Sequence, residues 1–392
     1  MRKPLTIALV HPFEYQQSYE SRLVCELLKQ ELLLISGVEI ISVNPSEFLS
    51  EVTQSVPGLR HAARILERLT LSPMLLRMRL DKIEQKARKQ KRDFSVLLSD
   101  QSLGTLTHAL TGYKILIFVH SLADFHAVQG GLGQPKGYQG RFEARMNTAG
   151  LIAAEGFITP TQTVMRELDS LSVGAQKRTI VAPLPLRHCI ASKQELDTRL
   201  ANLWRTRGIF PPPYILHCGS AHWNNNRSAL IYLCSELKKT RPVAPSLVFA
   251  GEEPSREEGS LIESTGISFY HFSEPSQQDV ETLLHGAICL AEIPALDGLG
   301  YHALQALDLG TPIAITQTDT LMETLSEAAA IITPVPTQDN VEEWSKESAK
   351  AVGQLLDMPE EDKANMAQEA LSYTSGFTEQ RFQGAIAKAL EG

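Results

Sequence analysis

Short apolar runs alternate with amphipathic segments along most of this chain. Residues 5–10, LTIALV, form an apolar run that a polar turn ends, which is typical of a buried parallel strand. Residues 18–36 then carry leucine and isoleucine at helical spacing and stop at Gly37, and residues 38–43 form the next apolar run. A strand, a helix and a strand in this order predict a βαβ unit and therefore a parallel sheet.

The same alternation continues to the end of the chain. Further strands are expected at 94–98, 114–120, 157–159, 214–218, 246–250, 267–269, 287–290, 313–315 and 330–332. Helices are expected at 59–92, 193–206, 226–239, 277–285, 300–309, 320–326, 341–356, 360–372 and 378–391. The glycine-rich segment 129–140, QGGLGQPKGYQG, predicts a loop between two of these elements.

Prolines mark the best domain boundary, because they gather between 183 and 213 on both sides of one helix. We expect a first domain over 1–185, a second over 186–376, and a C-terminal helix within 377–392 that returns to the first domain. A length of 392 residues suits two domains. The predicted fold is α/β, with two doubly wound Rossmann-like domains that face each other across a cleft, where strand ends and helix starts meet.

Composition narrows the class of protein. The net charge of −8 argues against a general nucleic-acid binder. No apolar run reaches the ~18 residues of a membrane span, and the first apolar run is too short for a signal peptide. The five cysteines contain no CxxC pair, so neither a disulfide framework nor a zinc site is expected. These features predict a reduced, cytoplasmic protein.

The strongest candidate chemistry lies in residues 296–314, LDGLGYHALQALDLGTPIA. Asp297 precedes Gly298 and Gly300, which flank Leu299 and open a predicted helix. Glycine lets a ligand approach the backbone, and the N–H groups at a helix start can hold an anion. The pattern therefore predicts an anion site at a strand end, and the alternative is a tight turn without a ligand.

Several segments, in this order and spacing, resemble the retaining glycosyltransferases of the GT4 group, which have the GT-B fold. They are FVHS (118–121), GFITPTQTV (156–164), YILHCGS (214–220), LVFAGEEP (247–254), DGLGYHALQALDLGTPIA (297–314) and ETLSEAAAIITP (323–334). The resemblance implies transfer of a sugar from a nucleotide-diphosphate sugar to a glycan, lipid-linked or protein acceptor. It also implies that the leaving diphosphate takes the acceptor proton, and no metal or cofactor is expected because no DxD motif occurs.

The resemblance assigns roles to individual residues. Asp297 and Gln305 stand where the family has two glutamates, which contact the donor sugar and the ribose. Aspartate is one methylene shorter, and glutamine lacks the charge that strengthens a hydrogen bond. His120 matches a histidine near the donor sugar, and Glu323 a glutamate near the nucleotide. His11, after the first strand, could point into the same cleft on the acceptor side. The alternatives are a satisfied core histidine for His120, a surface position for Gln305 and a helix N-terminal acid for Glu323.

The segment after Gly219 departs from the family. Many members carry arginine and lysine there to neutralise the diphosphate, whereas GSAHWNNNRSALIYL has Arg227 as its only cation. Losing two such cations removes charge-assisted bonds of ~1.5–3 kcal/mol each, so weaker donor binding is expected. Arg227 could bind phosphate, while Asn226 either joins the donor site, as in family members with a W-x-x-N form, or caps the helix. Glu252, after another strand end, could face the base or ribose.

Residues 75–92, LLRMRLDKIEQKARKQKR, predict a basic amphipathic helix. Such a helix could lie on an anionic membrane surface, or it could simply pack one side on the sheet and leave the other solvated. Three functions remain in competition: an active retaining glycosyltransferase, a non-catalytic GT-B scaffold or regulatory partner, and another GT-B activity such as a nucleotide-sugar epimerase. The sequence leaves the donor sugar, the base and the acceptor open.

Overall fold

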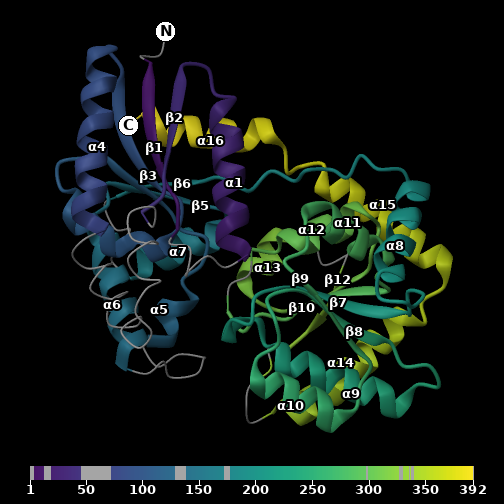
Figure 1. Ribbon diagram of the computed structural model, residues 1–392. Helices are drawn as coiled ribbons and strands as arrows, with labels where there is room; N and C mark the ends of the chain where they lie inside the picture. Colours follow the sequence, from purple (N-terminus) through teal and green to yellow (C-terminus); the bar gives the residue numbers. More distant parts are fainter. Residues whose placement is uncertain are drawn as a thin grey trace. The chain divides into compact units, whose positions relative to one another are not determined.

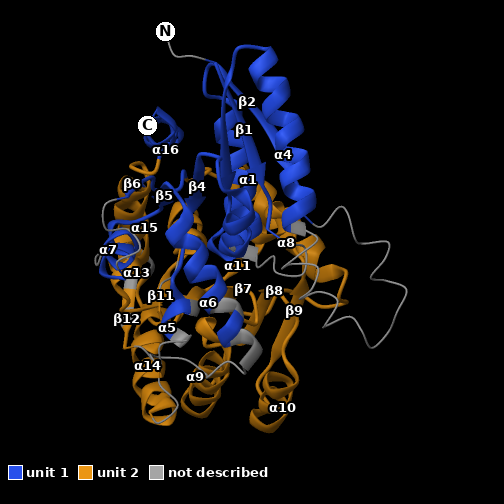
Figure 2. Ribbon diagram, turned by 90° about the vertical axis from the view of Figure 1, so that its left-hand side faces the viewer, with its two compact units in different colours: residues 1–131, 135–185, 378–392 blue, residues 132–134, 186–377 orange. Residues whose placement is uncertain are grey.

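The chain forms two compact units, which Figure 2 colours separately. One unit comprises Met1–Gly131, Pro135–Pro185 and Thr378–Gly392, and the other comprises Leu132–Gln134 and Leu186–Phe377. This computed structural model describes residues 4–12, 19–45, 72–128, 138–171, 177–296, 299–325, 330–334, 336 and 340–391. Each unit is built on its own parallel sheet with helices on both faces (Figure 1).

The first unit has six parallel strands in the order β2-β1-β3-β4-β5-β6. They are β1 (Leu5–Val10), β2 (Val38–Val43), β3 (Asp93–Leu98), β4 (Ile115–Phe118), β5 (Gly156–Thr159) and β6 (Arg178–Val181). The helices are α1 (Tyr19–Leu33), α4 (Ser72–Lys89), the 3₁₀ helix η3 (Gln101–Leu110), α5 (Ala123–Val128), α6 (Tyr138–Ala153), α7 (Gln162–Ser170) and α16 (Glu379–Glu391). The chain changes direction across the sheet between β1 and β3, which is therefore the topological switch point of this unit.

The core of the first unit follows the predicted apolar pattern. Leu76, Leu80, Ile83 and Ala87 of α4 are all buried, and the first three belong to the cluster that covers one face of the sheet. The C-terminal helix α16 belongs to this unit, where Gln383 Nε2 donates to Glu31 Oε2 on α1 at 2.9 Å. The exposed side of α4 carries basic residues such as Lys82 and Lys86 together with Met74 and Met78, so only one stripe of this helix contributes to the core.

The second unit has six parallel strands in the order β12-β11-β10-β7-β8-β9. They are β7 (Tyr214–Gly219), β8 (Ser246–Gly251), β9 (Phe269–Ser273), β10 (Cys289–Glu292), β11 (Ile313–Thr316) and β12 (Ala330–Thr333). The helices are α8 (Lys193–Arg205), the 3₁₀ turn η4 (Trp223–Asn225), α9 (Arg227–Thr240), α10 (Arg256–Thr265), α11 (Gln277–Gly286), α12 (Tyr301–Asp308), α13 (Asp319–Thr324), α14 (Val341–Leu356) and α15 (Glu360–Thr374). This is the order of a dinucleotide-binding Rossmann sheet, with its switch point between β7 and β10.

Some expected elements differ from the structure. The strand expected at 267–269 is shifted, because β9 begins at Phe269. Of the expected loop 129–140, residues 138–140 open helix α6, and residues 129–137 lie outside the described ranges, as do residues 59–71 of the expected basic helix. Helices η3, α5, α6, α7 and α10, the turn η4 and strand β6 were not predicted.

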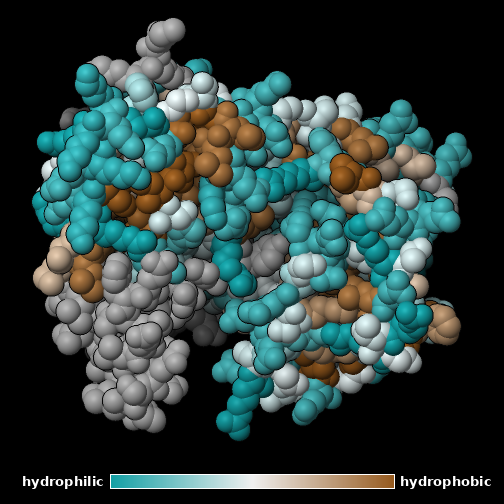
Figure 3. All heavy atoms as spheres, turned by 45° about the horizontal axis from the view of Figure 1, so that its top comes forward, coloured by the Kyte–Doolittle hydropathy of each residue, from teal (hydrophilic) through white to brown (hydrophobic). Residues whose placement is uncertain are grey.

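Figure 3 shows one face, on which hydrophilic side chains surround a few groups of apolar ones. The large apolar side chains that are exposed include Leu33 and Leu34 at the end of α1 and Met74 and Met78 on α4. In the part of the chain that the structure describes, every helix is too short or too polar to cross a bilayer.

Candidate functional site

Two glycines stand side by side at the carboxyl edge of the second sheet. Gly219 ends β7 and Gly251 ends β8, and the two residues are register partners. Their φ angles are 144° and 134°, and a Cβ on Gly251 would collide with the carbonyl oxygen of Gly219. Glycine is therefore required at 251 by the close approach of two strands, before any ligand is considered.

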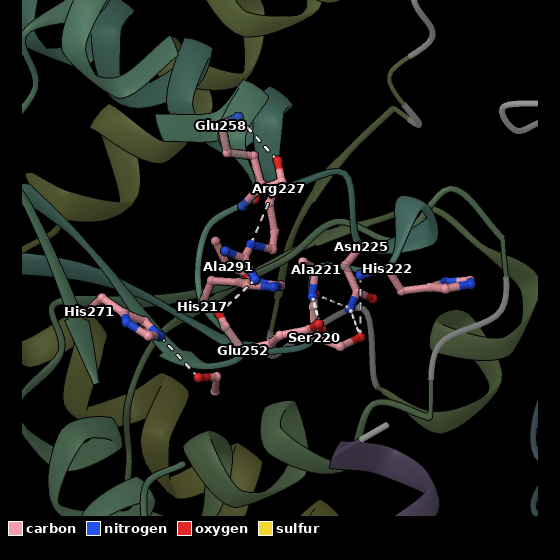
Figure 4. A network of polar contacts seen from close by, with 12 residues as sticks. His217, Ser220, Ala221, His222, Asn225, Arg227, Glu252, Glu258, His271 and Ala291 are labelled. Atoms are coloured by element: carbon pink, nitrogen blue, oxygen red, sulfur yellow. Dashed lines mark hydrogen bonds and ion pairs between the residues drawn. The ribbon is translucent and has the colours of Figure 1, made fainter. Parts of the chain in front are cut away.

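The loop that follows β7 is held by side chains from its own and the next strand end (Figure 4). The Ala221 N–H donates to Glu252 Oε2 at 2.8 Å. Asn225 Nδ2 donates to the Ser220 carbonyl oxygen at 3.0 Å and lies 3.3 Å from Ser220 Oγ. Glu252 is exposed, so its carboxylate lies on the outer side of this loop. The predicted role of Glu252 at the base or ribose stays a prediction, and its first partner here is the main chain.

Two asparagines fasten the β7 loop to the segment that follows β10. Asn224 Nδ2 donates to the Leu296 carbonyl oxygen, and the Leu296 N–H donates back to Asn224 Oδ1, both at 2.8 Å. Asn226 Nδ2 donates to the Ile293 carbonyl oxygen at 2.9 Å. The alternative that Asn226 caps α9 is wrong, because its side chain makes no capping bond and its backbone is left-handed, with φ 47°. Its amide instead fixes the chain that leads toward Asp297.

Arg227 is buried and engaged inside the unit. Its side chain is 1% exposed, and its Nε lies 3.2 Å from Glu258 Oε1, which is 8% exposed. Nη1 donates to the Glu252 carbonyl oxygen at 3.0 Å, and the guanidinium carbon lies 4.2 Å from the ring centroid of Phe249. The guanidinium therefore joins α9, α10 and the end of β8. Phosphate binding by Arg227 stays a prediction, since this geometry first gives it a structural partner.

The start of α12 combines a left-handed glycine with a buried amide. Gly300 precedes the helix at φ 64°, and Leu299 before it is partly exposed. Gln305 is 3% exposed, so the alternative of a surface position is wrong. Neither Oε1 nor Nε2 of Gln305 has a hydrogen-bond partner within the ranges that the structure describes. Asp297 and Gly298 lie outside those ranges.

Glu323 lies near the C-terminal end of α13 and is exposed. The alternative of a helix N-terminal acid is wrong for this residue, because Asp319 occupies the first turn and Thr318 caps the helix by accepting from the Leu321 N–H. Its predicted contact with the nucleotide stays a prediction.

The second unit also contains two buried histidines that the sequence reasoning missed. His217 Nδ1 lies 3.0 Å from the Ala291 carbonyl oxygen, and burial lowers the pKa of His217 to about 4. His302 Nδ1 lies 3.7 Å from Glu292 Oε1, and burial, together with nearby His217, lowers the pKa of His302 to about 3. Both imidazoles are therefore neutral near pH 7. The sequence did carry one signal for them, because His217 lies in a predicted strand and His302 in a predicted helix, both next to the switch point.

At the carboxyl edge of the first sheet, His120 follows β4 and is held by two residues that follow β3. Its Nε2 lies 2.8 Å from Asp100 Oδ2, and its main-chain N–H donates to Gln101 Oε1 at 3.1 Å. Burial raises the pKa of the Asp100 carboxyl, but hydrogen bonds from His120, Ser102 and Ser21 outweigh burial and lower it to about 2. Asp100 is thus an anion that orients the His120 ring. The sequence reasoning missed Asp100, although it lies two residues after a predicted strand.

His11 follows β1 on the same edge. Its N–H donates to the Val43 carbonyl oxygen at 2.9 Å, and its Nδ1 lies 3.5 Å from Cys25 Sγ. Burial raises the pKa of the Cys25 thiol to about 11, so the sulfur stays protonated. Because β1, β3 and β4 are neighbours in the sheet, His11, Asp100 and His120 share the edge at the switch point of this unit.

No metal centre is formed by the described residues, among which no group of three or more His, Cys, Asp and Glu side chains is arranged to hold an ion. The chemistry that these described edges offer consists of main-chain N–H groups, amides, imidazoles, and the carboxylates of Asp100 and Glu252.

Comparison with known proteins gives structural neighbours only, since no family model and no curated protein matches the sequence. Sucrose-phosphate synthase from Thermosynechococcus elongatus is similar at a TM-score of 0.68 with 14% identity, over 99% of this chain and 98% of that one. HepE of Anabaena, solved in complex with UDP-glucose, gives 0.65 with 12% identity, over 99% of both chains. WaaG, a glycosyltransferase involved in lipopolysaccharide biosynthesis, gives 0.61 with 14% identity, over 98% of both. The chain therefore has the two-domain, Rossmann-like fold of the GT-B glycosyltransferases, as its sequence predicts.

Proposed function

We propose that this protein is a retaining glycosyltransferase of the cytoplasm, which moves a sugar from a nucleotide-diphosphate sugar to a glycan, lipid-linked or protein acceptor. The observation that carries the proposal is Gln305, a buried amide without a hydrogen-bond partner in the described chain, on the helix that Gly300 opens. A buried amide left unpaired costs ~1–3 kcal/mol, so such a group calls for a polar ligand. Ribose hydroxyls, which both donate and accept, match its two ends.

The second unit supplies the donor side in this proposal. The diphosphate lies between the loop after Gly219 and the start of α12 at Gly300, held mainly by main-chain N–H groups. Asp297 contacts the donor sugar, and Gln305 contacts the ribose. Solved structures of HepE contain UDP and UDP-glucose, which supports a uridine nucleotide as the first ligand to test.

The first unit supplies the imidazoles. His120, whose Nε2 faces the Asp100 carboxylate, makes a hydrogen bond to the transferring sugar through Nδ1, and His11 lies on the acceptor side. The leaving diphosphate takes the acceptor proton, so no protein base is required. Reaction with retention needs no metal in this scheme, because the chain's own dipoles and N–H groups stabilise the developing phosphate charge.

Nucleotide binding is the first test. Thermal unfolding is followed with millimolar UDP, GDP and ADP and with their sugars, since a ligand that binds only the native state raises the melting temperature. We expect one nucleotide to raise it, and Asp297→Ala to abolish turnover while that shift persists. Asp297→Asn serves as the matched variant of similar size. If no nucleotide shifts the melting temperature, the proposal fails and a non-catalytic GT-B scaffold takes its place.

We further propose that α4 binds anionic lipid. Lys82, Lys86 and Lys89 are exposed on α4, together with Met74 and Met78, which are 56% and 52% exposed. Basic residues near an anionic membrane contribute about 1 kcal/mol each. Co-sedimentation with vesicles of anionic lipid should therefore fall at high salt and in Lys86→Glu/Lys89→Glu.

The matched control for that charge reversal is Lys346→Glu/Lys350→Glu, which changes two exposed lysines of α14. It should sediment with anionic vesicles as the unmodified protein does. Equal sedimentation with neutral vesicles, or equal loss in both double variants, would reject the electrostatic explanation.

A further inference from the structure

The carboxylate of Glu252 occupies a main-chain donor at the carboxyl edge of the second sheet. Its Oε2 accepts the Ala221 N–H at 2.8 Å, as Figure 4 shows. Ala221 belongs to the loop after β7, beside the switch point of the sheet, where a Rossmann unit binds the phosphates of its ligand. A carboxylate oxygen and a phosphate oxygen are chemically equivalent partners for such an N–H group.

The main chain of Glu252 is fixed, whereas its side chain is not. The Glu252 N–H donates to the Gly219 carbonyl oxygen at 3.3 Å, and its own carbonyl oxygen accepts from Arg227 Nη1 at 3.0 Å. Arg227 is held in turn by Glu258. The side chain of Glu252 is exposed, so rotation about its own bonds can remove the carboxylate from Ala221 without moving the loop.

The charges around this donor oppose an anion. Arg227 is the only arginine or lysine of segment 219–233, and its guanidinium is buried against Glu258. Glu252 and Glu253 both stand at the end of β8, and both are exposed. An incoming anion therefore meets a carboxylate both as a competitor for the N–H and as a like charge.

We propose that Glu252 sets the anion affinity of this edge, because its carboxylate must leave the Ala221 N–H before the diphosphate of a nucleotide sugar can bind there. The identity of the ligand rests on the proposed function, and the competition itself does not. Two consequences follow. Glu252 is a determinant of donor affinity without being a ligand of the diphosphate, and its removal tightens anion binding.

Calorimetric titration of the full-length protein with inorganic pyrophosphate and with UDP tests this proposal. Glu252→Gln removes the charge and keeps an acceptor oxygen, whereas Glu252→Ala removes both. Glu253→Gln is the matched control, because it removes the same charge one residue away. We expect Glu252→Ala to bind pyrophosphate at least about tenfold more tightly than the unmodified protein, with Glu252→Gln in between and Glu253→Gln within about threefold of the unmodified protein.

Each other outcome overturns the proposal. Equal tightening by Glu252→Gln and Glu253→Gln would mean that only net charge matters. Weaker binding by Glu252→Ala would make Glu252 a ligand contact, and no pyrophosphate binding by that variant would mean that the Ala221 N–H is not an anion site. A different result would contradict the proposed function alone. In that case pyrophosphate binds as expected, but UDP binds no more tightly than pyrophosphate and no sugar nucleotide is consumed. Melting curves of each variant confirm that it is folded.

Discussion

Replacing Arg227 tests how the second unit holds its loops together. The residue is 2% exposed and joins the Glu258 carboxylate, the Glu252 carbonyl oxygen and the face of Phe249. Arg227→Met keeps much of the apolar stem and removes the charge. It leaves the Glu258 carboxylate buried beside an apolar side chain, and such an unpaired buried charge strongly destabilises the folded state.

The expected loss is large for one substitution. Breaking a buried ion pair by removing one partner costs about 3–5 kcal/mol. Because about 2–4 °C of melting temperature is lost per kcal/mol in a domain of this size, Arg227→Met should melt ~6–20 °C lower. Arg227→Met/Glu258→Gln should recover most of that loss, since neither residue then carries a charge. The glutamine also keeps an oxygen for the Ser255 N–H, to which Glu258 Oε2 is bonded at 2.6 Å.

The chain offers a direct assay for this unit. All three tryptophans, Trp204, Trp223 and Trp344, belong to it, so tryptophan fluorescence during urea unfolding reports on the second unit alone. A loss below about 1 kcal/mol in Arg227→Met would refute the reasoning from burial, because exposed ion pairs contribute only ~0–1 kcal/mol. A double variant as unstable as the single one would refute the charge argument specifically.

Three further predictions follow from single buried groups. His217 and His302 have folded pKa values of about 4 and about 3, below the ordinary 6.5, so the unfolded chain binds more protons than the folded one in acid. The free energy of unfolding should therefore fall from pH 6.5 toward pH 4, by roughly 1–3 kcal/mol per pH unit. Urea unfolding at pH 7, 6 and 5 measures this slope, and an unchanged slope in His302→Gln would contradict it. Gln305→Leu removes a buried amide that has no partner in the described chain, so it should stabilise the protein by about 1–2 kcal/mol. It should also weaken nucleotide binding at least tenfold. Melting curves measure the first effect and calorimetry the second, and a lower melting temperature would reveal a partner for this amide. Gly251→Ala should lower the free energy of unfolding by more than about 3 kcal/mol, because the new Cβ would collide with the Gly219 carbonyl oxygen. Gly259→Ala in α10 has open space around it and should raise the free energy of unfolding by about 0.5–1 kcal/mol. Similar melting temperatures for the two variants would refute the close-approach argument.

The sheets could be predicted because parallel strands buried on both faces read as continuous apolar runs. Leu5–Val10 and Val38–Val43 begin and end where the pattern places them. Helix η3 was missed because its sequence contains Gly104 and two threonines, which are poor helix formers. The glycines of this region are explained by tertiary packing of η3 against α6. A Cβ on Gly104 would collide with the carbonyl oxygen of Asn147 on α6, and a Cβ on Gly150 would collide with the carbonyl oxygen of Gly104. No local signal carries that information.

The candidate site was predictable to the same extent. The glycines at strand ends and the polar residues after them follow from the alternation of strands and helices, which places Gly219, Gly300 and His120 at the carboxyl edges. The partners of Asn226 and Arg227 did not follow, because Ile293 lies 67 residues from Asn226 in the sequence and Glu258 comes from another helix. The local sequence suited a helix cap at Asn226 and a phosphate contact at Arg227. Only the packing of distant segments shows which partners these side chains have.

The asparagines after β7 connect the fold to the proposed chemistry. Where the sequence resemblance led us to expect cations, Asn224 and Asn226 bond the main chain after β10, and Arg227 turns inward to Glu258. The loop is therefore ordered by amide bonds to the main chain, and these two positions carry no positive charge. Under the proposed function, the diphosphate must then be held by oriented N–H groups, which cost little to reorganise but supply less attraction than a cation. The carboxylate of Glu252 on one of those N–H groups lowers that attraction further. This arrangement therefore favours a donor that binds weakly and is selected by its sugar and base rather than by its charge.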